Sequence, residues 1–114
     1  MKTKIIPEMG IEIETKIQHK GKTYAECEKE IPKGWRISTY EILQKLRNSE
    51  HIDILNLKIT CEFVQNPDEI SRKNGRVARF YAHSDRVDLD CSRNPDISYP
   101  ALGVRYFRRI KNEN

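Results

Sequence analysis

The chain of 114 residues is 37% hydrophobic and 33% charged, and its formal net charge is +4. Since this is the length of one ordinary domain, we predict a single domain over residues 1–114 with one hydrophobic core. Acidic and basic residues are interspersed along the chain, which weakens any polyanion-binding function, and no apolar run approaches the roughly 20 residues needed to cross a bilayer.

The first predicted element is a strand over residues 11–17, where apolar residues alternate with charged ones at the period of two of a half-buried strand. At Thr23 the period changes to that of a helix, which we expect to end at Pro32. Thr23 and Glu26 have the spacing of a capping box, in which each side chain bonds the backbone N–H of the other residue. The start of this helix is therefore well defined by sequence.

A second helix follows directly, with Ser38 or Thr39 as its cap and its end near Asn48. The strand period then returns over residues 57–63. The polar segment 68–75 is predicted to be a loop. The residues of the 57–63 strand that we expect to face one side are Leu57, Ile59, Cys61 and Phe63.

Two further strands, 76–83 and 86–91, flank Ser84–Asp85, a gap of the length of a tight hairpin turn. A second loop over residues 92–101 leads to a last strand over residues 102–110. The order of strand, helix, helix and then antiparallel strands indicates an α+β domain.

The three cysteines, Cys27, Cys61 and Cys91, lie about thirty residues apart, without the close pair that zinc ribbons and redox motifs need. Each lies within an otherwise apolar pattern, so we predict buried thiols that serve as small hydrophobic side chains. The opening residues meet acidic side chains before a signal-peptide hydrophobic region can form, which predicts a cytoplasmic protein.

Two stretches have a recognisable order, since TYAEC at 23–27 opens the first helix and GWRIST at 34–39 opens the second. This order resembles the two-helix signature of the C-type-lectin-like fold. It is similar to the GWRLPT-type step of small bacterial and viral domains of unknown function, and more distantly to formylglycine-generating enzymes. The strands over residues 78–110 resemble the closing pattern of the same fold. One departure is Ser38, which stands where the step usually has a proline.

The resemblance implies a small single domain with two short helices packed on a curled antiparallel sheet, in which the N- and C-terminal strands are paired. It also implies that Trp35 fills the junction between the helices, with Gly34 allowing the backbone to turn. Recognition in this fold uses the segment between the second helix and the closing strands, so we expect a ligand surface on loops 64–76 and 91–101. The candidate ligand-binding residues are Asn66, Asp68, Arg72, Arg93, Asn94, Asp96 and Tyr99.

Both loops contain the sequence Asn-Pro-Asp, at residues 66–68 and 94–96. The likeness to calcium-dependent lectins, which place an acid or amide beside a proline at their calcium and sugar site, raises the question of a metal. Asn-Pro-Asp is also an ordinary turn sequence, because proline presets φ and the flanking side chains bond the backbone. The Trp-Asn-Asp partner of those lectins is absent, so we expect no metal ion and no cofactor.

We therefore predict a non-enzymatic binding module with a protein or glycan partner and no membrane contact. The alternative is a nucleic-acid-binding protein that uses the arginines and aromatic residues of the C-terminal strands. Against that alternative, Val104 and Tyr106 would face the core and the arginines would form a solvated face. A third hypothesis is an enzyme with Cys91 as nucleophile, paired with His83.

Overall fold

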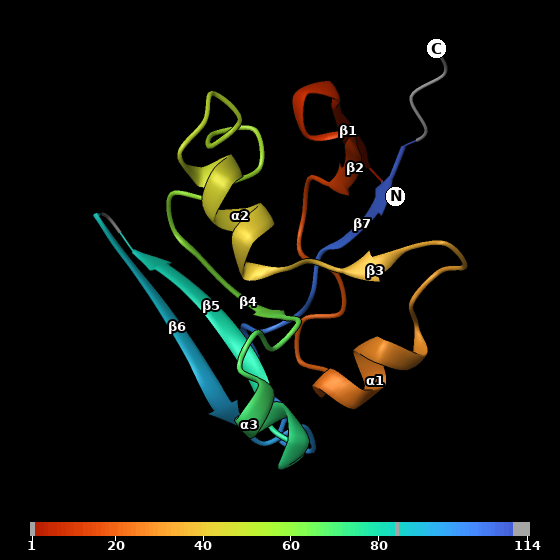
Figure 1. Ribbon diagram of the computed structural model, residues 1–114, viewed down its shortest axis with the longest axis vertical. Coiled ribbons are helices and arrows are strands. Elements are labelled where there is room, and N and C mark those ends of the chain that lie inside the picture. Colours follow the sequence, from red (N-terminus) through yellow and green to blue (C-terminus); the bar gives the residue numbers. More distant parts are fainter. Residues whose placement is uncertain (1, 84, 111–114) are drawn as a thin grey trace.

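Seven strands and three helices make up the fold of the computed structural model, which describes residues 2–83 and 85–110 (Figure 1). The strands are β1 (Thr3–Ile6), β2 (Ile11–Glu14), β3 (Arg36–Ile37), β4 (Thr60–Val64), β5 (Val77–His83), β6 (Arg86–Arg93) and β7 (Tyr106–Arg109). The helices are α1 (Tyr24–Lys29), α2 (Tyr40–Arg47) and α3 (Glu69–Lys73). The radius of gyration of 13.6 Å agrees with the roughly 13 Å of a compact domain of this size.

The strands form two antiparallel sheets rather than the one sheet that the sequence predicted. One sheet has the order β1-β2-β7-β3 and the other the order β4-β5-β6. In Figure 1 the β5–β6 hairpin and the β1, β2 and β7 strands lie on opposite sides of the molecule, with β4 between them. The α+β class is therefore confirmed, with a second sheet and a third helix added.

The predicted pairing of the opening and closing strands is confirmed for β2 and β7, where Ile11 lies opposite Arg109 and Ile13 opposite Phe107. The strand β1 was not predicted. It forms a hairpin with β2 through a 3-10 turn at Pro7–Met9 and lies at the edge of its sheet. Ser84, half of the turn predicted between β5 and β6, lies outside the described residues.

Both predicted helices are present and begin where their caps were expected. The Thr23 hydroxyl accepts a hydrogen bond from the N–H of Glu26, whose carboxylate accepts one from the N–H of Thr23, so the capping box is complete. Of the two caps proposed for α2, Thr39 is the one used, because its hydroxyl accepts from the N–H of Ile42. The predicted loop 68–75 is wrong in its middle, where Asp68 caps the short helix α3.

The closing strand β7 separates two clusters of buried side chains. Phe107 belongs to the cluster between α2 and the strands of both sheets, together with Leu43, Leu46 and Phe80. Tyr106 points the other way, into a cluster with residues from α1, β3 and β4. Alternating side chains of one strand therefore supply both parts of the core, as the period of two requires.

The segment just before β7 joins the two sheets through its backbone. The N–H of Phe63 in β4 donates to the carbonyl of Gly103 at 2.8 Å, and Val104 exchanges two hydrogen bonds with Gln18. A Cβ atom at Gly103 would lie 2.1 Å from the carbonyl oxygen of Gln18, so the close approach requires glycine. Gln18, which follows β2, and Phe63 of β4 thus bond to neighbouring residues of this segment, which links the two sheets.

A buried ion pair connects the same segment to β4 through side chains. Arg105 is 1% exposed, Glu62 is 0% exposed, and Arg105 Nε lies 3.3 Å from Glu62 Oε1. Arg105 Nη1 also donates to the carbonyl of Leu55 at 2.7 Å, and the Thr60 hydroxyl donates to Glu62 Oε2 at 2.7 Å. These partners compensate two charges that could not be buried singly.

The ion pair explains two wrong expectations. The alternation predicted for residues 57–63 fails because Glu62 is buried while Ile59 is 67% exposed. The solvated arginine face predicted for the last strand holds for Arg108 and Arg109 but not for Arg105. A charged residue faces inward at each of these two positions because an opposite charge meets it there.

Breaking this pair should destabilise the fold strongly. We expect Arg105→Met to lower the free energy of unfolding by about 3–5 kcal/mol, because Glu62 becomes an uncompensated buried charge. Adding Glu62→Leu should restore part of that loss by removing the stranded charge. Urea unfolding of both single variants and of the double variant gives the coupling energy, and a coupling near zero would contradict this role.

Glu14 is a second buried carboxylate: it is 1% exposed and accepts a hydrogen bond from the N–H of Tyr106 at 2.7 Å. Burial raises the pKa of Glu14 above its ordinary value of 4.5, although that hydrogen bond and Arg105 oppose the change. The folded chain therefore holds a proton that the unfolded chain has lost, and this group makes the free energy of unfolding fall as pH rises above about 4.5.

Glu14→Gln keeps the accepting oxygen and removes the ionisation. We expect the stability of the variant relative to the natural chain to increase as pH rises from about 4 to about 7. Urea unfolding at several pH values checks this, and a difference that stays constant over the range would show that Glu14 does not titrate differently on folding.

Candidate functional site

The two Asn-Pro-Asp sequences form the same kind of turn in the two predicted ligand loops. In each, the side-chain oxygen of the asparagine accepts the backbone N–H of the aspartate two residues later, at 2.9 Å for Asn66 and Asp68 and at 2.9 Å for Asn94 and Asp96. This is the local bonding that makes asparagine a turn residue. The turn interpretation therefore accounts for the near-repeat.

Asn66 makes further hydrogen bonds that hold its loop against the sheet. Its side-chain nitrogen lies within hydrogen-bond distance of the Ser71 hydroxyl and of the carbonyls of Arg76 and Cys91, at 3.0, 3.1 and 3.1 Å. Asn66 is only 7% exposed, and Arg72 Nη1 donates to its carbonyl at 3.0 Å. The amide of this predicted ligand residue is thus occupied in holding loop 64–76 against β6.

Arg93 and Tyr99 of the second predicted loop bind each other. The Arg93 guanidinium lies 5.2 Å from the centre of the Tyr99 ring and donates to its hydroxyl at 3.3 Å. Arg93 Nε is also 3.0 Å from Asp90 Oδ2. Hydrogen bonds from Ser92, together with this arginine, lower the pKa of Asp90. These contacts fix the loop on β6.

A groove of about 530 Å³ lies where α1, β3, α3 and the second predicted loop meet. Its lining includes two aromatic rings, three arginines and one acid. We call it the tryptophan groove and define it by Tyr24, Glu28, Trp35, Arg36, Arg72 and Arg76.

Only part of the predicted site reaches this groove. Among the seven predicted residues Asn66 and Arg72 line it, and Pro95 brings in the second loop. The lining does not include Asp68, Arg93, Asn94, Asp96 or Tyr99. Sequence reasoning missed Tyr24, Arg36 and Arg76 as groove residues and assigned Trp35 to packing alone.

Trp35 is half-buried and serves both packing and the groove wall. It packs against the cluster that contains Tyr106, and the Arg108 guanidinium lies 5.0 Å from the centre of its ring. Gly34 before it has φ 86, a conformation that glycine adopts without strain, so the expected turn at this position is confirmed. The indole is therefore held between the core and the groove.

Gln65 fixes the floor of the groove and connects the two sheets. Its backbone N–H donates to the carbonyl of Ser38 at 2.9 Å, and its side-chain nitrogen donates to the carbonyl of Ile37 at 2.7 Å. It also forms a parallel bridge with Thr39. The end of β4 is thereby bonded to the connection between β3 and α2, so that Trp35 and Arg72 are held by one rigid base.

The arginines of the groove differ from most other surface arginines in their partners, although Arg109 also has no carboxylate within 4.0 Å among the described residues. Within residues 2–83 and 85–110, Arg36, Arg72 and Arg76 have no carboxylate within 4.0 Å. By contrast, four surface arginines each lie within 4.0 Å of an aspartate or glutamate, namely Arg79, Arg86, Arg93 and Arg108. The groove thus holds three arginines whose charge no carboxylate of the described residues compensates within 4.0 Å.

Outside the groove, Glu8, Glu50 and His51 place three potential metal-ligand atoms within 4.8 Å of one another. His51 Nε2 lies 2.6 Å from Glu8 Oε1 and 3.9 Å from Glu50 Oε1. The hydrogen bond to His51 is the main cause that lowers the pKa of Glu8. The imidazole nitrogen that would bind a metal therefore already has a carboxylate partner.

The thiols lack the environment of a nucleophile. Burial raises the pKa of Cys27 to about 11 and also raises the pKa of Cys61 and Cys91. His83 pairs with Arg86 at one end of the hairpin, while Cys91 is five residues farther along β6, roughly 17 Å at the rise of a strand. The Cys91–His83 pair is therefore wrong.

Comparisons with known proteins assign no family: no family model, no curated protein and no solved structure matches the chain. Of the described helices, none has the length and apolar character to span a bilayer.

Asn66 and Asn94 form matched turns with different burial, so their alanine variants should differ in their effect on the free energy of unfolding. We expect Asn66→Ala to lower the free energy of unfolding by about 2–3 kcal/mol, since it removes the buried donor of the carbonyls of Arg76 and Cys91. Asn94→Ala loses one exposed turn bond and should cost less than about 1 kcal/mol. Thermal and urea unfolding check the pair, and equal effects would contradict the anchoring role of Asn66.

Proposed function

We propose that the protein is a non-enzymatic recognition module that binds an anionic segment of a protein or glycan partner in the tryptophan groove. The decisive observation is that Arg36, Arg72 and Arg76 lack carboxylate partners among the described residues and line one groove with Tyr24 and Trp35. Arginine forms bidentate hydrogen bonds with carboxylate, sulfate and phosphate groups, and an aromatic ring offers a flat apolar surface beside them.

The charge and size of the groove fit such a ligand. Three arginines against one glutamate, Glu28, leave a formal charge of +2 in the lining. The volume of about 530 Å³ lies within the usual range of ligand sites. All three arginines are exposed, so an anionic group could reach them without any change in the core.

The framework under the groove also supports recognition rather than catalysis. Gln65 and Asn66 bond the groove floor to both sheets, and they place Arg72 and Arg76 on a rigid base. Loops supported in this manner can present a binding surface without rearranging. No activated thiol is found within the described part of the chain.

A C-type-lectin-like fold with a curled sheet is part of this proposal. The β2–β7 pair, the two helices and a separate β4-β5-β6 sheet are compatible with that resemblance. Loops 64–76 and 91–101 both contribute to the rim of the groove, through Arg72, Arg76 and Pro95. A cytoplasmic location belongs to the proposal as well.

The nucleic-acid alternative has weaker support. On β5, β6 and β7, Arg79 and Arg93 share Asp90, Arg86 pairs with Asp88, and Arg108 pairs with Glu12. Phosphate groups would have to compete with these carboxylates, and Arg105 is buried. A polyanion would therefore meet a largely neutralised surface on the C-terminal strands.

The groove is tested with three anionic probes: a hexaglutamate peptide, a sulfated hexasaccharide and a single-stranded oligo-dT. Trp35 is the only tryptophan, so its fluorescence reports binding in the groove directly. We expect the peptide or the saccharide to change this fluorescence in a saturable manner. The double variant Arg36→Gln/Arg76→Gln should weaken binding by about tenfold or more, since it removes charge-assisted hydrogen bonds.

Arg86→Gln is the matched control, because Arg86 is exposed but already paired with Asp88. It should bind like the natural chain, and circular dichroism should show all variants folded. Equal affinity in the double variant, or no response to any probe, would refute the proposed site. Binding of oligo-dT alone, with an affinity that collapses between about 50 and 200 mM salt, would favour the nucleic-acid alternative.

A further inference from the structure

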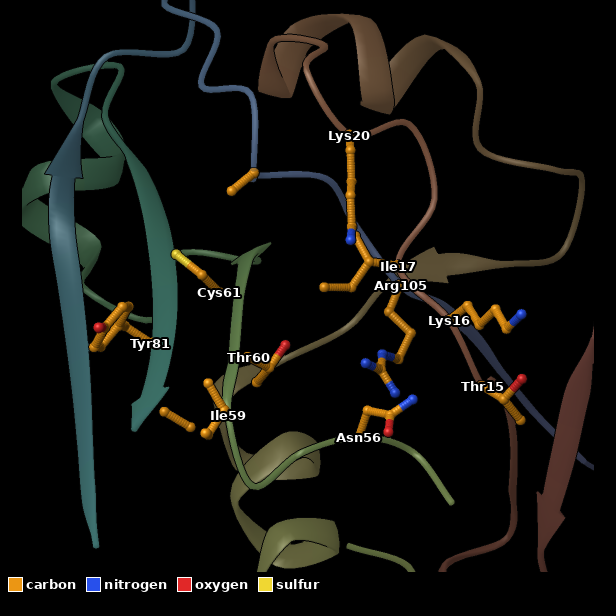
Figure 2. A pocket seen from close by; sticks show the side chains of 12 residues that line it. Thr15, Lys16, Ile17, Lys20, Asn56, Ile59, Thr60, Cys61, Tyr81 and Arg105 are labelled. Carbon is orange, nitrogen blue, oxygen red and sulfur yellow. The ribbon is translucent and has the colours of Figure 1, made fainter. Parts of the chain in front are cut away.

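A second cavity, of about 450 Å³, lies between the segment that follows β2 and the strands β4 and β5 (Figure 2). None of its lining residues also lines the tryptophan groove. Its walls come from residues 15–20, 56–61 and 81–82, with Ala101 and Arg105 from the closing part of the chain. The cavity is therefore a separate feature of the fold.

One part of this cavity is apolar. Ile17, Ile59, Ala82 and Ala101 all line it. Ile59 is 67% exposed, although it directly precedes β4 and had been expected in the core. A large aliphatic side chain at the mouth of a cavity offers a ligand apolar surface that is otherwise left in water.

The other part of the cavity is basic. Figure 2 shows the Lys20 ammonium and the Arg105 guanidinium directed toward the space beside Ile17 and Thr60, while Lys16 points away. Among the residues that the structure describes, no aspartate or glutamate lines the cavity. A ligand that enters this part of the cavity therefore meets the side chains of Lys20 and Arg105.

Arg105 and Lys20 contribute differently to the charge in the basic part of the cavity. Arg105 is already paired with Glu62, which leaves the net charge of the floor near zero. Its Nη2 donates to Glu62 Oε2 at 3.3 Å, and the side chain is 1% exposed. Lys20 is exposed and has no carboxylate within 4.0 Å in residues 2–83 and 85–110, so it supplies the uncompensated charge.

We propose that this cavity binds a small amphipathic carboxylate. The apolar body of the ligand, about six to ten carbon atoms long, would lie against Ile17, Ile59 and Ala101, and its carboxylate would face Lys20. A carboxylate satisfies the unpaired ammonium, whereas a neutral head group would leave it uncompensated and an ammonium head group would be repelled. The charge of Lys20 and the apolar lining thus both favour an amphipathic carboxylate.

The test compares three eight-carbon probes that differ only in their head groups: octanoate, octanol and octylamine. Isothermal titration of the natural chain should show saturable one-to-one binding of octanoate, binding of octanol weaker by about tenfold, and no binding of octylamine. Each methylene group added between hexanoate and octanoate should tighten binding by about fourfold. Absence of saturable octanoate binding, or equal affinity for octanoate and octanol, would overturn the proposal.

Variants of two exposed lining residues locate the site. Lys20→Gln removes the charge and Ile59→Asn removes the apolar wall, and each should weaken octanoate by about fivefold or more. The matched controls are Lys33→Gln and Ile70→Asn, since both residues are exposed and lie outside this lining. The controls should bind within about twofold of the natural chain, and indistinguishable affinities of Lys20→Gln and Lys33→Gln would exclude this cavity.

The cavity can be tested independently of the tryptophan groove. Lys20→Gln and Ile59→Asn should leave the fluorescence response of Trp35 to the groove probes unchanged, because the two linings share no residue. Octanoate binding that is lost in Arg36→Gln/Arg76→Gln but retained in Lys20→Gln would assign the carboxylate to the tryptophan groove and refute the second site.

Discussion

The buried ion pair between Arg105 and Glu62 is the constraint on which the arrangement of the two sheets depends. Each charge alone would cost several kcal/mol to remove from water, and only this geometry compensates both. The carbonyl of Leu55 and the hydroxyl of Thr60 satisfy further atoms of the pair. A shift of the closing segment by one residue would turn Arg105 to the opposite side, so the pair fixes the register between this segment and β4.

That register extends to the groove through a chain of backbone hydrogen bonds. The carbonyl of Arg105 accepts bonds from both the N–H and the hydroxyl of Ser38, and the carbonyl of Ser38 accepts from the N–H of Gln65. Asn66, the next residue, reaches the carbonyls of Arg76 and Cys91. Ser38 thus has a structural use, since its hydroxyl donates a hydrogen bond to the carbonyl of the buried arginine just before β7. The groove arginines stand on this connected base.

How much of the structure the sequence predicts depends on how far apart the interacting residues lie. The caps of α1 and α2 were predictable because Thr23–Glu26 and Thr39–Ile42 interact within one turn. The strand β2 was predictable from its alternation, although it ends at Glu14 instead of residue 17 and Glu14, expected to face solvent, is buried. The burial of Glu62 was not, because the residue alternates as a solvent-facing acid would and its partner lies 43 residues away. The tryptophan groove could not be predicted from sequence for the same reason, since α1, β3 and α3 meet only in the folded chain.

The net charge of +4 conceals a division among the cations that matters more for binding than the total. On β5 and β6, arginines such as Arg79 and Arg93 are paired with Asp90, and their guanidinium groups lie over the rings of Tyr81 and Tyr99. In the groove, Arg36, Arg72 and Arg76 have no carboxylate within 4.0 Å among the described residues. A partner that offered only high charge density would gain little binding affinity from the surface on which arginines are paired with aspartates. A partner with a few anionic groups at the spacing of the groove would gain most, and its affinity would depend only weakly on salt because few counterions are released. The distribution of carboxylates therefore favours geometric over general electrostatic recognition.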